Sequence, residues 1–188
     1  MRWVTLYARS RQVPAAFAAL LVVTATVWFP GRDAWNAVLA SLALTAGVAV
    51  TATGLSGQDA DLDRAAALPW PVRRFAHLAL LGVVAGALVL GVQELGPSQV
   101  ALAVVVRDAA GLAGLAGLAV TAAGGHFGWT LPLAWCAISP FVPNDTSTSS
   151  RVAAWLLQPP GTAAATWTAV VLAVTGAVAY TAWGGRRG

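Results

Sequence analysis

The chain has 188 residues, of which 58% are hydrophobic and 10% are charged. Soluble domains are roughly 45–50% apolar and about 25% charged, so the composition excludes an ordinary soluble domain and predicts an integral membrane protein. The net charge of +4 comes from arginines that bracket apolar runs, which does not fit nucleic-acid binding.

Several kinds of chemistry are excluded by missing residue types. Lysine is absent, which rules out a Walker-type phosphate loop and a lysine Schiff base. Cys136 is the single cysteine, so the chain has no internal disulfide. We therefore expect no enzyme activity, no catalytic residue, no metal site and no cofactor bound by this chain.

Apolar runs in chain order predict six membrane-spanning helices, each needing about 20 residues. The fifth run is short and contains Pro132 and Pro140, which can kink or shorten a helix, so five spans are the alternative. Short connections leave no room for a second domain, and residues 1–188 are predicted to form one transmembrane domain. The predicted spans are 14–29, 34–55, 75–95, 108–124, 129–142 and 163–183.

The arginines predict the orientation of this all-α bundle. With the N-terminus in the cytoplasm, eight arginines fall on the cytoplasmic side and three on the outer side. Both termini are then cytoplasmic, in a multi-pass protein of the bacterial cytoplasmic membrane. Before the first span, Trp3, Leu6 and Tyr7 lie opposite the local arginines, which predicts a short amphipathic helix in the membrane interface or, alternatively, a solvated basic tail.

The predicted outer segment 143–161 contains one apolar run, VAAWLL at 152–157, that is too short to span. We expect a re-entrant segment that dips into or lies on the outer leaflet. Tryptophans near predicted span ends are expected to act as interfacial anchors. These are Trp28, Trp35, Trp129, Trp155 and Trp183.

Glycines are regularly spaced in two predicted spans. Gly82 and Gly86 stand four residues apart in the third, and Gly111, Gly114 and Gly117 repeat every third position in the fourth. Small residues allow helices to approach closely, and packing drives helix association in lipid. These faces are predicted to pack within the bundle or to form a dimer interface.

Arg107 and Asp108 are expected at the outer boundary of the fourth span. An arginine at the bilayer centre costs about 2.5–3.5 kcal/mol, and a boundary position relieves that cost because the side chain can reach water. The pair either marks the start of the helix or forms an outer gate or substrate contact that faces the bundle interior.

The longest charged segment, residues 58–74, separates two uncharged runs and is the predicted docking site for a soluble partner. Its prolines fix backbone torsions and would make it stiff. The residues predicted to contact the partner are Asp61, Asp63, Arg64, Leu68, Pro69, Trp70, Pro71, Arg73 and Arg74.

Three stretches resemble the membrane subunit of type-2 ABC exporters, including small actinobacterial members. They are DRAAALPWPVRRF at 63–75, RDAAGLAGLAGLA at 107–119 and GWTLPLAW at 128–135. The resemblance implies a permease subunit that dimerises with itself or a related permease. It also implies that the loop at 58–74 couples to a separate ATPase subunit, which would bind ATP and magnesium.

The expected activity is outward transport of a hydrophobic or amphipathic substrate such as a lipid, peptide or drug, because the predicted spans are apolar. A function of a different class is the alternative. In that case the chain would be a non-transporting membrane anchor or regulatory subunit that docks a cytoplasmic partner through the same loop.

Overall fold

The computed structural model describes residues 13–55, 70–143 and 145–185. These ranges contain α-helices, short 3-10 turns and no strand, as the sequence predicts. The predicted amphipathic helix before residue 13 lies outside them. The helices are α2 (Val13–Gly31), α3 (Ala37–Ala52), α5 (Trp70–Gln93), α6 (Leu102–Ala123), α7 (Thr130–Ile138), α8 (Thr148–Ala153) and α9 (Ala163–Trp183).

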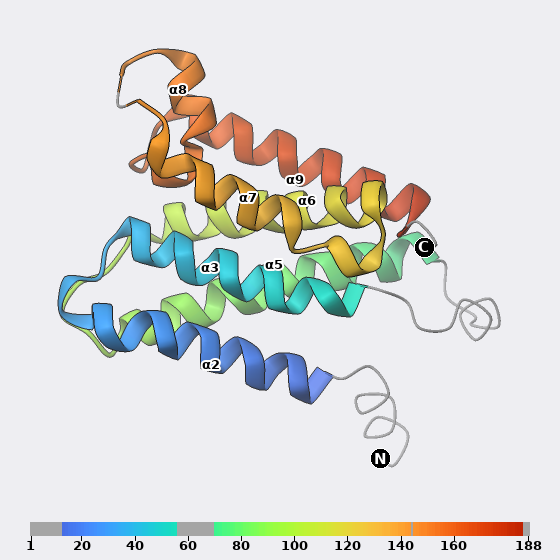
Figure 1. Cartoon of the computed structure of the whole chain (residues 1–188), viewed down its shortest axis with the longest axis horizontal. Coiled ribbons are helices and arrows are strands. Elements are labelled where there is room, and N and C mark those ends of the chain that lie inside the picture. The colour runs from blue at the N-terminus through green and yellow to red at the C-terminus, as the bar shows by residue number, and fades with distance from the viewer. Residues whose placement is uncertain (1–12, 56–69, 144, 186–188) are drawn as a thin grey trace.

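The helices form a bundle in which successive elements run between the same two ends (Figure 1). The turns after α2 and α5 lie at one end, together with α8, and the start of α2 and the end of α9 lie at the other. Helix α6 occupies the centre and packs against α3, α5, α7 and α9, with its most extensive contact to α9. Residues of α6 therefore contact four of the other described helices.

Three helices are long and apolar enough to cross a membrane: Pro71–Gln93, Leu102–Ala123 and Ala163–Trp183. This finding supports a helical membrane protein. Helix α7 has nine residues and a length of about 14 Å, less than half of the roughly 30 Å hydrocarbon core. The predicted fifth span is thus a short helix followed by a 3-10 turn at Ser139–Phe141, in which Pro140 lacks the N–H that would continue the helix.

Local sequence explains where several helices begin and end. The Asn36 side chain accepts hydrogen bonds from the amides of Val38 (2.9 Å) and Leu39 (3.2 Å) and so caps α3. Pro71 stands in the first turn of α5, where its missing N–H breaks no helical bond. Gly124 (φ 103°) and Gly184 (φ 67°) follow α6 and α9 in conformations that side chains disfavour.

The boundary predicted for the fourth span is wrong. Helix α6 begins at Leu102, not Asp108, so Arg107 and Asp108 lie inside the helix rather than at its start. The apolar residues 102–106 belong to the helix as well. The interior position is tolerated because other elements supply hydrogen-bond partners to both charged side chains, as described below.

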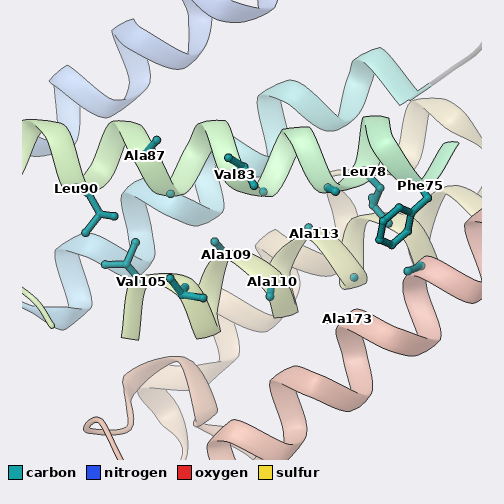
Figure 2. Close-up of a pocket in the computed structure, with 16 residues that line it drawn as sticks. Phe75, Leu78, Val83, Ala87, Leu90, Val105, Ala109, Ala110, Ala113 and Ala173 are labelled. Carbon is teal, nitrogen blue, oxygen red and sulfur yellow. The ribbon is translucent and has the colours of Figure 1, made fainter. Parts of the chain in front are cut away.

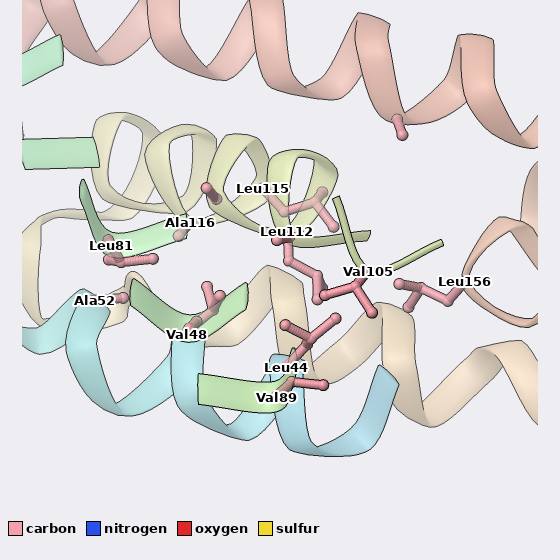
Figure 3. Packing of buried hydrophobic residues seen from close by; sticks show 14 of the residues in the cluster. Leu44, Val48, Ala52, Leu81, Val89, Val105, Leu112, Leu115, Ala116 and Leu156 are labelled. Atoms are coloured by element: carbon pink, nitrogen blue, oxygen red, sulfur yellow. The ribbon is translucent and has the colours of Figure 1, made fainter. Parts of the chain in front are cut away.

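The core lies between α3, α5 and α6. Figure 3 shows Leu44 and Val48 of α3 close to Val89 of α5 and to Leu112 of α6. Leu115 of α6 belongs to the same buried cluster. Many apolar side chains on the outer faces of α5 and α9 remain exposed, as expected where lipid surrounds a bundle.

Two tryptophans do not fit the predicted role of interfacial anchor. Trp35 is 4% exposed and Trp155 is completely buried, and both belong to the core cluster. Trp183, by contrast, is 72% exposed at the end of α9. Trp35 and Trp155 follow polar turns in the sequence, but the chain folds these positions back onto the bundle, so their rings fill the core.

Candidate functional site

A buried ion pair lies in the second turn of α6. The Arg107 Nε donates a 2.8 Å hydrogen bond to Asp108 Oδ1, and the two side chains are 6% and 0% exposed. The Ser41 hydroxyl of α3 lies 3.0 Å from Asp108 Oδ2. The same hydroxyl also lies 3.0 Å from the Leu156 carbonyl oxygen, so the single Ser41 hydroxyl proton is shared between two acceptors.

The Arg107 guanidinium reaches beyond α6 to the segment that precedes α9. Its Nη2 donates to the carbonyl oxygen of Gln158 (3.0 Å) and its Nη1 to that of Pro159 (3.4 Å). Arg107, Asp108 and Ser41 therefore connect α6, α3 and residues 156–159 through five hydrogen bonds. We call these three side chains the Arg107 network.

The predicted re-entrant run packs into the bundle next to this network. Its residues form the end of α8 and a 3-10 turn at Trp155–Leu157. The Trp155 ring rests on Gly111 of α6, where a Cβ atom would lie 2.9 Å from ring atom Cζ3. Trp135 of α7 donates through its indole N–H to the Ala153 carbonyl oxygen at 2.9 Å, which holds the same segment from a second side.

The glycines of α6 face different neighbours at successive turns. Gly111 receives Trp155, whereas a Cβ atom on Gly114 would overlap the Leu172 carbonyl oxygen of α9. A Cβ atom on Gly117 would lie 2.9 Å from the Gly176 carbonyl oxygen. The backbones of α6 and α9 are thus in direct contact, which only glycine permits.

The glycines of α5 also face α6. A Cβ atom on Gly82 would lie 3.3 Å from the Ala113 Cβ, and one on Gly86 would lie 3.5 Å from the Ala109 Cβ. These are contacts within one chain. The contacts are looser than those between α6 and α9, and the remaining space between α5, α6 and α9 forms an open groove.

This groove has a volume of about 490 Å³ and is lined only by apolar side chains and glycines. Phe75 lies toward one end of it and Leu90 and Val105 toward the other (Figure 2). Ala173 and Ala177 contribute the α9 wall. The walls of the groove can contact an apolar ligand. They contain no polar side chain.

Only part of the predicted docking loop is described. Asp61, Asp63, Arg64, Leu68 and Pro69 lie outside the described residues, as does most of the segment 58–74. Trp70 and Pro71 open α5, and Arg73 and Arg74 follow in its first turns.

Arg74 connects the start of α5 with the end of α9. Its Nη1 donates to the Thr181 carbonyl oxygen at 3.3 Å, and its guanidinium lies against Gly184, where a Cβ atom would be 2.6 Å from Cζ. A cation at the carbonyl end of a helix is electrostatically favourable. Through this side chain, the element that follows the predicted docking loop is attached to a second helix.

Among the described residues, no group of three His, Cys, Asp or Glu side chains could hold a metal ion. Ser41 and the carbonyl groups of Gln158 and Pro159 were not predicted from sequence as partners of the charged pair. Ser41 interrupts an apolar run in α3, which is a weak signal, but backbone carbonyls carry no sequence signal at all.

Comparison of the chain with family models, with curated proteins and with solved structures found no match.

Proposed function

We propose that this chain is the membrane-spanning permease subunit of an ATP-driven exporter in a bacterial cytoplasmic membrane. It dimerises with itself or with a related permease and couples to a separate ATPase subunit through residues 58–74. ATP and magnesium bind to that ATPase. The substrate is hydrophobic or amphipathic and moves outward.

One observation carries the proposal, namely the Arg74 hydrogen bond between the start of α5 and Thr181 of α9. A partner that pulls on residues 58–74 would move α5, and Arg74 would carry that movement to α9. Helix α9 in turn contacts α6 backbone to backbone at Gly114, so a displacement of α9 would also move α6. Packed elements of this kind transmit small shifts because they are hard to compress.

Other features support the same function. The described bundle is helical with three helices that could span a membrane, and the resemblance at 63–75, 107–119 and 128–135 points to the type-2 ABC exporter class. In this proposal both termini and the loop 58–74 are cytoplasmic, the helices make six spans, and the segment around Trp155 is re-entrant from the outer side.

The test is affinity purification of the detergent-solubilised chain from its native membrane, followed by mass-spectrometric identification of bound proteins. We expect a soluble protein with a Walker phosphate loop. Replacement of Leu68–Pro71 by Gly and Ser should abolish its recovery, because the stiff segment is lost. The same replacement at Leu95–Ser98, a proline-containing turn at the other end of the bundle, is the matched control.

Two results would count against the permease. Recovery of a signalling protein or an unrelated enzyme in place of an ATPase would support the membrane anchor or regulatory subunit. Equal ATPase recovery from wild-type and Leu68–Pro71 variants would show that the coupling site lies elsewhere.

A further inference from the structure

A cation lies just beyond one end of the groove between α5, α6 and α9. Along α5 its lining extends from Phe75 to Leu90, and Arg74 directly precedes the first of these residues. On α9 the last lining residue is Ala177, one helical turn before Thr181, which accepts the Arg74 hydrogen bond. Arg74 does not line the groove itself, but its guanidinium lies about one helical turn beyond the groove at this end.

The dimensions of the groove suit one hydrocarbon chain. Fifteen residues of α-helix separate Phe75 from Leu90, a rise of about 22 Å. One leaflet of a bilayer contributes half of the roughly 30 Å hydrocarbon core, or about 15 Å. The groove is therefore longer than one leaflet is deep, and an acyl chain of that leaflet can lie in it over the full length of the chain. The groove volume of 490 Å³ is within the range of roughly 300–1,000 Å³ found for ligand pockets.

We propose that this groove binds one acyl chain of an anionic phospholipid, with the lipid phosphate beside Arg74. The occupant follows from charge complementarity, since an apolar channel with a guanidinium about one helical turn beyond its end matches a long hydrocarbon chain attached to an anion. Guanidinium groups bind phosphate strongly, and basic sites between membrane helices recognise anionic lipid headgroups. The site does not depend on whether the chain is a permease.

The rim of the groove faces outward. Phe75, Val83 and Val106 line it and are 55%, 66% and 56% exposed. A lipid could therefore enter sideways from the bilayer without any helix moving. A second copy of the chain could fill the groove only by inserting a helix among the same residues. The oligomeric state of a variant in the groove wall distinguishes this occupant from a lipid.

The experiment is native mass spectrometry of the purified full chain with phosphatidylglycerol and, separately, phosphatidylcholine of the same acyl chains. We expect one phosphatidylglycerol to be retained, with about fivefold higher affinity than phosphatidylcholine. The electrostatic attraction between one arginine and an anionic lipid headgroup accounts for a difference of this size. Equal retention of the two lipids would overturn the assignment of the phosphate to Arg74.

Two variants with matched controls locate the site. Ala110→Phe should abolish the retained lipid, because Ala110 is an exposed position in the groove wall and the ring would fill the channel. Ala25→Phe, at an exposed alanine of α2 outside the groove, should leave binding unchanged. Equal lipid retention in these two variants would place the lipid elsewhere on the protein.

Arg74→Gln should remove the preference for phosphatidylglycerol while keeping binding of the chain. Arg73→Gln removes the same charge one residue earlier and should keep the preference. Arg74 stands one helical turn before the lining residue Leu78, whereas Arg73 is rotated by about 100° around α5. Equal effects of the two variants would indicate general attraction to anionic lipid and contradict the site. A dimer that Ala110→Phe converts to monomer, with lipid retention unchanged, would assign the groove to a second copy.

Discussion

At the scale of single residues, the chain contains two Arg-Asp dipeptides with opposite environments. Arg32 and Asp33 lie in a turn, with side chains 50% and 87% exposed and a 3.8 Å separation of Nε from Oδ2. Arg107 and Asp108 are buried at 2.8 Å, with further partners on α3 and before α9. Exposed pairs contribute little to stability, whereas a buried pair that loses one partner leaves a costly charge.

Asp108→Asn should therefore lower the free energy of unfolding by about 3–5 kcal/mol, because Arg107 would stay buried without a counter-charge. The measurement is denaturant titration of the purified protein in detergent. Asp33→Asn makes the same chemical change in the exposed dipeptide and should have little effect. Equal losses in the two variants would mean that the Arg107 network does not hold the bundle together.

At the scale of elements, the contact between α6 and α9 is the most extensive in the described bundle, and it brings the two backbones together. A Cβ atom on Gly114 would overlap the Leu172 backbone of α9, and one on Gly176 would overlap the Gly114 backbone of α6, so neither position has room for a methyl group. Gly91 of α5 is the opposite case, since a Cβ atom at that position would meet nothing within 4 Å. The same residue type thus serves packing at one site and has no packing role at the other.

Gly114→Ala should lower the free energy of unfolding by about 1–3 kcal/mol, because α6 and α9 would have to separate. Gly91→Ala should instead raise it by about 0.5–1 kcal/mol, because alanine favours the helix and finds open space. The same detergent titration measures both changes. A Gly114→Ala variant as stable as wild type would disprove the close contact.

Sequence predicted the elements better than their contacts. The bounds predicted for the last span, 163–183, are those of α9, since a long apolar run is followed by Gly184. The start of α6 was missed because Arg107 and Asp108 resemble a helix boundary when their partners are unknown. The spacing of the glycines in α6 predicted close contacts but not their partners. In the structure Gly111 contacts Trp155, and Gly114 contacts the backbone of α9.

At the scale of the whole molecule, the bundle has two ends with distinct loops. Helix α8, which contains Ser149, and the turn between α5 and α6, which contains Ser98, lie at one end (Figure 1). The 3-10 turn Gly125–Phe127 connects α6 to α7 at the end that carries the start of α2 and the end of α9. Helix α7 is too short to connect these ends alone, and the 3-10 turns before and after it complete the connection. If the two ends face opposite sides of a membrane, the chain crosses it an even number of times.

Cysteine labelling tests this topology. In a Cys136→Ala background, Ser98→Cys and Ser149→Cys should both react with a membrane-impermeant maleimide in intact cells, and Phe127→Cys should not. Disruption of the cells should make Phe127→Cys reactive, which controls for side-chain access. Protection of Ser149→Cys together with Phe127→Cys in intact cells would show that α7 does not cross and would support five spans.

The sequence by itself determined the class of this protein and most of its helices, because membrane insertion depends on composition and run length, which are local properties. It also indicated that the glycine faces of α5 and α6 would be close contacts. Only the tertiary structure decided which Arg-Asp pair is buried, where Trp155 packs, and that Arg74 lies just beyond the end of an apolar groove. Those features depend on backbone carbonyls and side chains from distant segments, such as Ser41 with Asp108, and no single stretch of sequence encodes such a meeting.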